Sequence, residues 1–200
     1  AASPVTISAG TGAVTLSGSV GSSKDISNLS ITSATLSANA VKTSSAFNVT
    51  VSGASSVSGV IAGAGALTKE GAGTLTLSSG SSTYTGATNI NAGVVKLGAS
   101  SSGDNSPLGV ASGATTVASG AALDLAGYTL GTAEPLTVSG TGVGGSGAVY
   151  NSSSTGATWA GPTTLVGDTT FKSEAGGGLT WSGTINGAYA LTVDTDGPSS

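Results

Sequence analysis

Short runs in which apolar and polar residues alternate fill most of this chain, and they restrict its fold more than any other feature. Each run is three to five residues long and is closed by Gly, Ser or Asn. Examples in chain order are VTISAG, VTLSG, ATLSAN, NVTVSG, TLTLSSG, VVKLG, ALDLAG, LTVSG and LTWSG. Alternation with a period of two, rich in Val, Thr, Leu and Ile, is typical of strands that bury one face. Because no long window keeps a helical period, we predict an all-β protein without helices.

A second, longer period indicates how these strands are stacked. Residues 26–37 align with residues 46–57 at a separation of 20, which places Asn28 over Asn48. Similar residues recur at comparable separations in three further sets: Leu77, Leu97, Val117 and Leu136; Tyr128 and Tyr150; Trp159 and Trp181. In a parallel β-solenoid, equivalent residues of successive coils stack about 4.8 Å apart, which explains such recurrence. We therefore predict a parallel β-helix (β-solenoid) of about nine coils of 19–23 residues. An antiparallel sandwich is the alternative.

The composition excludes several classes of function. Only 14 of the 200 residues are charged, whereas about a quarter of an ordinary globular chain is. The chain has no Cys, His or Arg, which excludes disulfides, thiol or imidazole catalysis, and Cys or His metal sites. The five lysines are scattered, so we predict no nucleic-acid partner. No apolar run is long enough to span a membrane, and no signal peptide is visible; a signal for export would lie outside this sequence.

Residues 63–98, GAGALTKEGAGTLTLSSGSSTYTGATNINAGVVKLG, carry a specific motif. They resemble the passenger-associated transport repeat of bacterial autotransporter passengers, through the LTK, GxGTLTLS, TYTG and LG segments. Ser82 stands where that repeat usually has Asn, and Val95 where it often has Leu. Residues 107–181 resemble more loosely the coils that accompany the repeat. The resemblance implies a right-handed parallel β-helix on the bacterial cell surface or released from it, in a family made up mostly of adhesins.

The resemblance carries no catalytic residues, so we predict no catalytic site and no cofactor. Residues 1–200 are expected to form one continuous solenoid segment of a longer protein, with the repeat at 63–98. In this frame Lys69 and Glu70 are expected on a solvated turn.

Carboxylates are the main chemistry left to such a chain, and three pairings are possible. Asp194 and Asp196 in VDTDG are two positions apart and are weak candidates for a calcium site, although the rest of a calcium-loop pattern is absent. Asp104 with Asp124, and Glu174 with Asp194, are each 20 apart and could stack on adjacent coils as a glycosidase pair. Isolated acids on solvated turns are the simpler interpretation.

The two tryptophans have two interpretations. Trp159 and Trp181, one coil apart, could form an exposed platform on which sugars stack, or an internal ladder in the core. The core is favoured because ATWAG and LTWSG place Trp where other runs have Leu or Val. The glycine-rich GTGVGG is not a dinucleotide motif, because no helix is expected to follow it.

These observations predict a non-enzymatic β-solenoid stalk or fibre segment of a bacterial surface or secreted protein, with an adhesive role. The resemblance implies that it is extracellular or on the bacterial outer-membrane surface. The expected partners are further coils of the same chain or other copies placed end to end, together with host or neighbouring-cell surfaces or glycans. The alternative is a carbohydrate-binding or carbohydrate-cleaving β-helix, and a third hypothesis is self-association through Ser- and Thr-rich faces.

Overall fold

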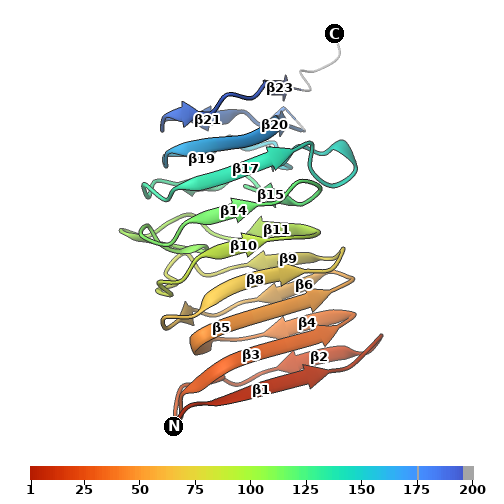
Figure 1. Cartoon of the computed structure of the whole chain (residues 1–200), viewed down its shortest axis with the longest axis vertical. Helices are drawn as coiled ribbons and strands as arrows, with labels where there is room; N and C mark the ends of the chain where they lie inside the picture. The colour runs from red at the N-terminus through yellow and green to blue at the C-terminus, as the bar shows by residue number, and fades with distance from the viewer. Residues whose placement is uncertain (175, 196–200) are drawn as a thin grey trace.

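The computed structural model describes residues 1–174 and 176–195 of the chain. Its strands wind into a parallel β-solenoid of about nine coils, with the N terminus at one end of the rod (Figure 1). The near strands of Figure 1 run from left to right, the far strands return, and the chain rises with each circuit, so the solenoid is right-handed. The predicted fold class is confirmed.

Three faces run along the rod, and successive coils pair in parallel on each. Face 1 consists of β1 (Ser3–Ser8), β3 (Ile26–Ser33), β5 (Val41–Val51), β8 (Ala66–Glu70), β10 (Thr88–Ile90), β14 (Thr115–Val117), β17 (Leu136–Gly140), β20 (Thr163–Ser173) and β22 (Ile185–Asn186). Face 2 consists of β2 (Ala13–Leu16), β4 (Thr35–Ala38), β6 (Ser55–Val57), β9 (Thr74–Leu77), β11 (Val94–Leu97), β15 (Ala122–Asp124), β18 (Val149–Asn151), the end of β20, and β23 (Leu191–Thr195). Face 3 is shorter and has β7 (Ile61–Ala62) beside the start of β5, and farther along β16 (Thr129–Leu130), β19 (Ala157–Trp159) and β21 (Leu179–Trp181).

The register confirms some of the expected stacks and corrects others. Leu77 pairs with Leu97 and Trp159 with Trp181, as predicted. Asn28, however, pairs with Ala46 rather than with Asn48, because the step from β3 to β5 is shorter than the predicted period. The partner of Asn48 in this register is Ser30.

The stacks predicted beyond Leu97 are wrong for a related reason. An insertion after β11 lengthens the step from β10 to β14, so Val117 stacks on Ile90 rather than on Leu97. Likewise Leu136 pairs with Thr115, and Tyr150 pairs with Asp124 rather than with Tyr128. The number of residues between paired positions of successive coils therefore varies more widely than predicted, because the corners accommodate extra residues while the strands keep their pairing.

The inward side chains of successive coils form one core. A single hydrophobic cluster extends from Val14 to Phe171 along the rod. Leu29, Phe47 and Leu67 follow one another in register on face 1, and none is more than 1% exposed. Each buried side chain of this size contributes about 1.5–3 kcal/mol to folding through the hydrophobic effect.

Glycine is required at the corners where coils approach closely. Gly63 has φ 99°, and a Cβ atom there would lie 2.1 Å from the carbonyl oxygen of Thr43 on the coil below. Only glycine adopts this backbone conformation without strain.

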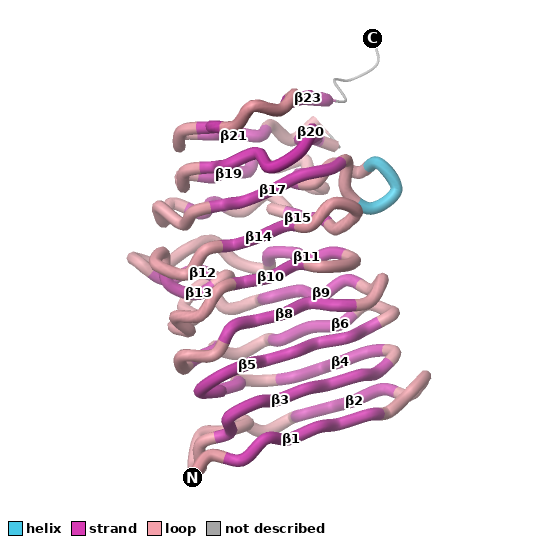
Figure 2. Tube along the Cα trace, viewed as in Figure 1, coloured by secondary structure: helices cyan, strands magenta, loops and turns pink. Residues whose placement is uncertain are grey.

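Two segments depart from the regular coil (Figure 2). The insertion between β11 and β14 contains an antiparallel pair, β12 (Asn105–Ser106) and β13 (Gly109–Val110). A 3₁₀ turn, Val143–Gly145, lies between β17 and β18. Within the described residues, no helix has the length and hydrophobicity needed to cross a membrane.

Candidate functional site

The outer side of face 1 presents a ladder of small polar side chains, one from each coil. Its nine rungs are in register and lie about 4.8 Å apart. We call these residues the face-1 ladder: Thr6, Ser30, Asn48, Thr68, Asn89, Thr116, Thr137, Thr164 and Asn186. Each is exposed or half-buried, and none is charged. The ladder therefore offers hydroxyl and amide groups at a constant spacing along the rod.

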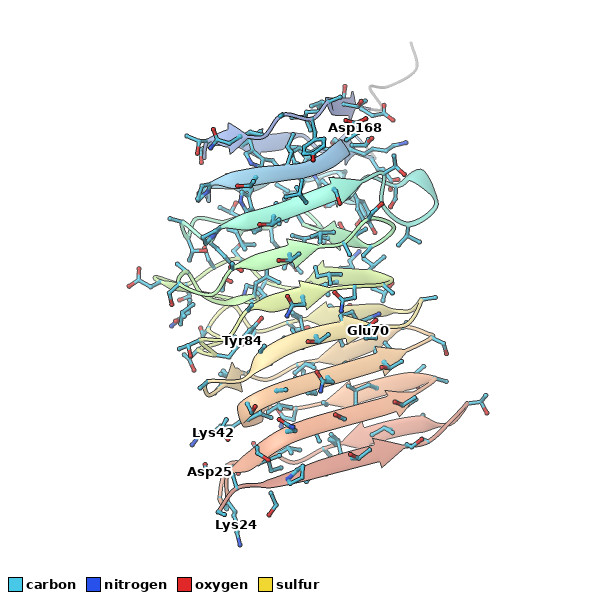
Figure 3. The ribbon with its side chains drawn as sticks, viewed as in Figure 1. Lys24, Asp25, Lys42, Glu70, Tyr84 and Asp168 are labelled. Carbon is cyan, nitrogen blue, oxygen red and sulfur yellow. The ribbon has the colours of Figure 1, made fainter. Side chains whose placement is uncertain are left out.

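A parallel row flanks part of this ladder. Ser8, Thr32, Thr50 and Glu70 follow one another in register two positions farther along each strand. The amide of Asn91 donates a hydrogen bond of 2.6 Å to Glu70 Oε1, which extends the row to the next coil. Glu70 is labelled in Figure 3. The two rows together form a broad polar surface suited to many weak hydrogen bonds.

The outer side of face 2 is different, because its later coils carry charges in register. Lys96, Asp124, Tyr150, Lys172 and Asp194 occupy successive rungs. Lys96 Nζ lies 3.1 Å from Asp124 Oδ2, and Lys172 Nζ lies 3.4 Å from Asp194 Oδ2. Burial raises the pKa of Tyr150, and the nearby charges of Asp124 and Glu174 raise it further. These charges therefore connect adjacent coils.

Asp124 is almost fully buried, at 1% exposure, and its carboxylate is well satisfied. Besides Lys96, it accepts hydrogen bonds from the backbone N–H of Ala126 at 2.9 Å and from the hydroxyl of Ser152 at 2.7 Å. A buried carboxylate with this many donors is stable as a structural element. It leaves no free oxygen facing a neighbouring acid, as a glycosidase pair would need.

Lys69 does not lie on a solvated turn, so that prediction is wrong. Its side chain is fully buried, at 0% exposure, and it stacks between Val49 and Ile90 in the interior of face 1. The period of two that places Leu67 inward also places Lys69 inward, although Glu70 beside it points outward. The cation therefore occupies a core position.

Backbone carbonyls at a corner of the solenoid make this position possible for a cation. Lys69 Nζ donates to the carbonyl oxygens of Glu70 at 2.8 Å, Gly71 at 2.7 Å and Ala92 at 3.1 Å. Each ammonium proton thus has an acceptor, and the bonds join two adjacent coils. Burial lowers the Lys69 pKa to about 8, although the nearby Glu70 charge opposes this shift.

Glu134 is a second interior ionisable group, and it was not predicted from the sequence. It is 0% exposed. Its Oε1 accepts a hydrogen bond from the Thr115 hydroxyl, and its Oε2 accepts one from the Ser106 hydroxyl at 3.2 Å. Burial raises the Glu134 pKa to about 8 despite these two hydrogen bonds, so the carboxyl is mostly protonated at neutral pH. The sequence did offer a signal, because Glu134 lies in the same alternating set as Leu130, Leu136 and Val138, the set expected to face inward.

Tyr84 extends the polar interior on the same side of the rod. Its hydroxyl lies 2.6 Å from Thr88 Oγ1, which in turn donates to the carbonyl oxygen of Leu108 at 3.1 Å. Since Thr88 uses its proton on Leu108, Tyr84 is the donor to Thr88. Burial raises the pKa of Tyr84. These bonds fasten the insertion to the coil below it; Figure 3 labels Tyr84.

The two tryptophans lie on face 3, one above the other. Trp159 is 0% exposed and Trp181 is half-buried; their ring centroids are 6.1 Å apart with an interplanar angle of 24°. Trp181 also stacks on Phe171 with centroids 4.4 Å apart, and its Nε1–H donates to Thr163 Oγ1 at 2.9 Å. Trp159 has no ring face open to a sugar, so the pair does not form a shared exposed platform.

The candidate acids are dispersed. Asp194 is exposed and paired with Lys172, and Asp196 lies outside the described residues. Asp124 stacks on Lys96 rather than on Asp104, and Asp194 stacks on Lys172 rather than on Glu174. In the part of the chain that the structure describes, no cluster of three or more Asp or Glu residues is placed to hold a metal ion.

The structure is therefore a right-handed parallel β-solenoid, and most of its charged side chains form ion pairs or hydrogen bonds between its own coils. Residues 67–97 match the family described as the passenger-associated-transport-repeat. The repeat and the solenoid together fit an autotransporter passenger β-helix, which confirms the resemblance seen in residues 63–98. The comparisons with curated proteins and with solved structures found no match.

Proposed function

We propose that this chain is a non-enzymatic, adhesive stalk segment of an autotransporter passenger, displayed on the bacterial surface or secreted. The observation that carries this proposal is the uninterrupted face-1 ladder on a solenoid that contains the passenger-associated transport repeat. Hydroxyl and amide groups in register over nine coils can make many simultaneous hydrogen bonds to a polar surface. Each bond is weak, but their effects combine when both partners are extended and rigid.

Adhesion of displayed cells tests this proposal. Thr68→Lys, Thr116→Lys and Thr137→Lys would place three cations on the face-1 ladder, where they disturb contact without touching the core. The matched control places lysines on the equivalent outward rungs of face 2, at Ser37, Ser56 and Thr76. We expect the face-1 variant to lose adhesion to host cells or abiotic surfaces, whereas the face-2 variant keeps it. Equal adhesion by the two variants at equal display levels and melting temperatures would contradict the proposal.

The last described coil supports a second part of the proposal, which is that the solenoid continues by contact with further coils or other copies. Ile185, Tyr189 and Val193 are 38%, 51% and 60% exposed. Ile185 and Val193 stack on Thr163 and Phe171, which are both buried, so the same positions are covered one coil farther in. Among the described residues, β22 and β23 pair with β20 alone, and an unpaired strand edge favours strand addition. We propose that another coil, from the same polypeptide or from a second copy placed end to end, covers this surface.

Electron microscopy and light scattering over a range of concentrations test pairing between copies of this segment. End-to-end pairing predicts rods that lengthen with concentration, and Val193→Lys should shorten them. A control substitution on the outward side of face 1, Thr164→Lys, should leave rod length unchanged. A monodisperse monomer at every concentration would count against pairing between copies.

A further inference from the structure

A group of hollows lies away from the face-1 ladder, beside the first face-3 strands, where coils 1 to 3 pass from face 2 to face 1. Three adjoining hollows of about 420, 160 and 280 Å³ share lining residues and form one groove. Asp25 and Ile26 line the first and second hollows, and Lys42 lines the second and third. The first hollow alone has a volume typical of pockets for small ligands. We call this feature the corner groove.

The corner groove is walled by a loop that the regular coil does not need. The step from Val5 to Leu29 is longer than the step from Leu29 to Phe47 in the next coil, and the extra residues form the loop 21–25. Val20 anchors the loop, because its N–H donates to the carbonyl of Ala40 and its own carbonyl accepts from the N–H of Lys42, both at 2.9 Å.

Glycine at the start of the loop fixes its path against the coil above. Gly21 has φ 77°, and a Cβ atom there would lie 2.2 Å from the Lys42 carbonyl oxygen. The Ser44 hydroxyl donates to the Ile26 carbonyl at the other end of the loop, at 3.5 Å. The wall is therefore held at both ends, and the groove exists before any ligand arrives.

Charge sets this groove apart from the rest of the surface. Of the five lysines, Lys69 is buried, and Lys96 and Lys172 pair with acids of the next coil. The remaining two, Lys24 and Lys42, both line the corner groove. Figure 3 shows them at the same edge of the rod, with Asp25 between them. The cationic side chains not used inside the solenoid are thus gathered at one place in a chain of net charge −4.

Asp25 does not cancel this charge. Its carboxylate lies 3.5 Å from Lys42 Nζ, but the two side chains are 66% and 52% exposed, so the pair is weak. Two cations and one anion leave an excess of one positive charge. An incoming carboxylate can compete with Asp25 for Lys42, and Lys24 adds a second positive charge farther along the same groove.

The remaining lining matches a sugar better than a bare anion. Ser19, Ser22 and Ser44 supply hydroxyl groups, whereas Val20 and Val60 supply a small aliphatic surface. A sugar ring combines polar edges with an apolar C–H face, and a uronic acid adds one carboxylate. We propose that the corner groove binds an acidic saccharide, with Lys24 and Lys42 supplying the positive charges that attract its carboxylate groups. This site is separate from the face-1 ladder and does not depend on its adhesive role.

Retention of the protein on immobilised acidic polysaccharides tests the proposal. The probes are polygalacturonate, alginate and hyaluronan, each paired with its carboxyl-reduced form, which keeps the sugar and removes the charge. We expect saturable binding to at least one acidic polymer, weaker binding to its reduced form, and weakening by salt. Lys24→Gln and Lys42→Gln should each reduce affinity about fivefold, the effect of losing one exposed ionic contact. The control Lys172→Gln removes the same charge far along the rod and should change nothing.

The other outcomes would overturn the proposal. Binding that is the same for the reduced polymers, or that survives in the Lys24→Gln, Lys42→Gln double variant, would place recognition elsewhere. Displacement by inorganic phosphate as efficient as by galacturonate would indicate a general anion site. If no acidic polymer binds, the groove does not recognise this class, and the adhesion assay on the face-1 ladder remains a separate measurement.

Discussion

The buried carboxyl of Glu134 makes a strong prediction about how stability depends on pH. Its native pKa is about 8, against an ordinary value of 4.5, because burial penalises the charged form. Between these values the native protein binds more protons than the unfolded chain. The free energy of unfolding must therefore fall as pH rises from about 4.5 to about 8.

The size of the effect follows from the shift. Each unit of pKa difference corresponds to about 1.36 kcal/mol, so Glu134 can lower stability by up to about 5 kcal/mol across this window. That is a large fraction of the stability of an ordinary domain. Structural relaxation would reduce the figure but would not change its sign.

Urea unfolding at a series of pH values, followed by circular dichroism, measures this slope in the wild type and in Glu134→Gln. The amide is nearly isosteric and keeps an acceptor and a donor for the hydroxyls of Thr115 and Ser106, but it does not ionise. We expect the variant to lose most of the wild-type decline in stability between about pH 5 and pH 8. Asp104→Asn, which removes an exposed acid from the same insertion, is the control and should keep the slope. The reasoning is refuted if Glu134→Gln and the wild type show the same slope.

Three other substitutions test the solenoid interior. Lys69→Met should destabilise the protein by about 1–3 kcal/mol because it leaves three carbonyl oxygens without their donor. Above about pH 8 the native Lys69 loses its proton before Lys69 of the unfolded chain does, so wild-type stability should rise there, and the variant should lack this rise. Urea midpoints measure both effects, and unchanged midpoints would contradict the bonding. Gly63→Ala should cost at least about 1 kcal/mol by thermal melting, given φ 99° and the nearby Thr43 carbonyl, whereas Gly10→Ala, which has positive φ but open space, should cost less. Trp159→Ala should cost about 3–5 kcal/mol, whereas Trp159→Phe should be milder because the indole N–H has no partner among the described residues; equal losses for the two would contradict the view that ring packing supplies the stabilisation.

The fold was predictable because its two periods come directly from geometry. Alternation with period two identifies a strand with one buried face, and recurrence of similar residues at a longer, nearly constant interval identifies stacked coils. Leu77 over Leu97 and Trp159 over Trp181 were found in this way and are correct. The stack of Asn28 on Asn48 failed because corners of different length can shift one coil against the next without changing its strand pattern.

The interior polar groups were missed for a different reason. Charge suggests exposure, and that rule placed Lys69 on a solvated turn and overlooked Glu134. The alternation itself was the better guide, since Lys69 follows Leu67, and Glu134 precedes Leu136, by two positions. What the sequence could not supply was the set of partners that stabilises a charged or polar group at these positions. The carbonyl of Ala92 and the hydroxyl of Ser106 come from 23 and 28 residues away.

These partners also explain what the matched repeat contributes mechanically. Within residues 67–97, Lys69 joins two corners through carbonyl oxygens, and Tyr84 reaches the insertion through Thr88. A leucine at either position would fill the same space by packing alone. Packing of this kind tolerates a two-residue shift of one strand against the strand of the next coil. A hydrogen-bonded ammonium does not tolerate such a shift, because all three acceptors must be in place at once to offset its loss of hydration. The polar members of the repeat therefore help to fix the register, Lys69 between two regular coils and Tyr84 with Thr88 beside the insertion. This role requires no ligand and is compatible with a segment whose work is to hold an extended surface straight.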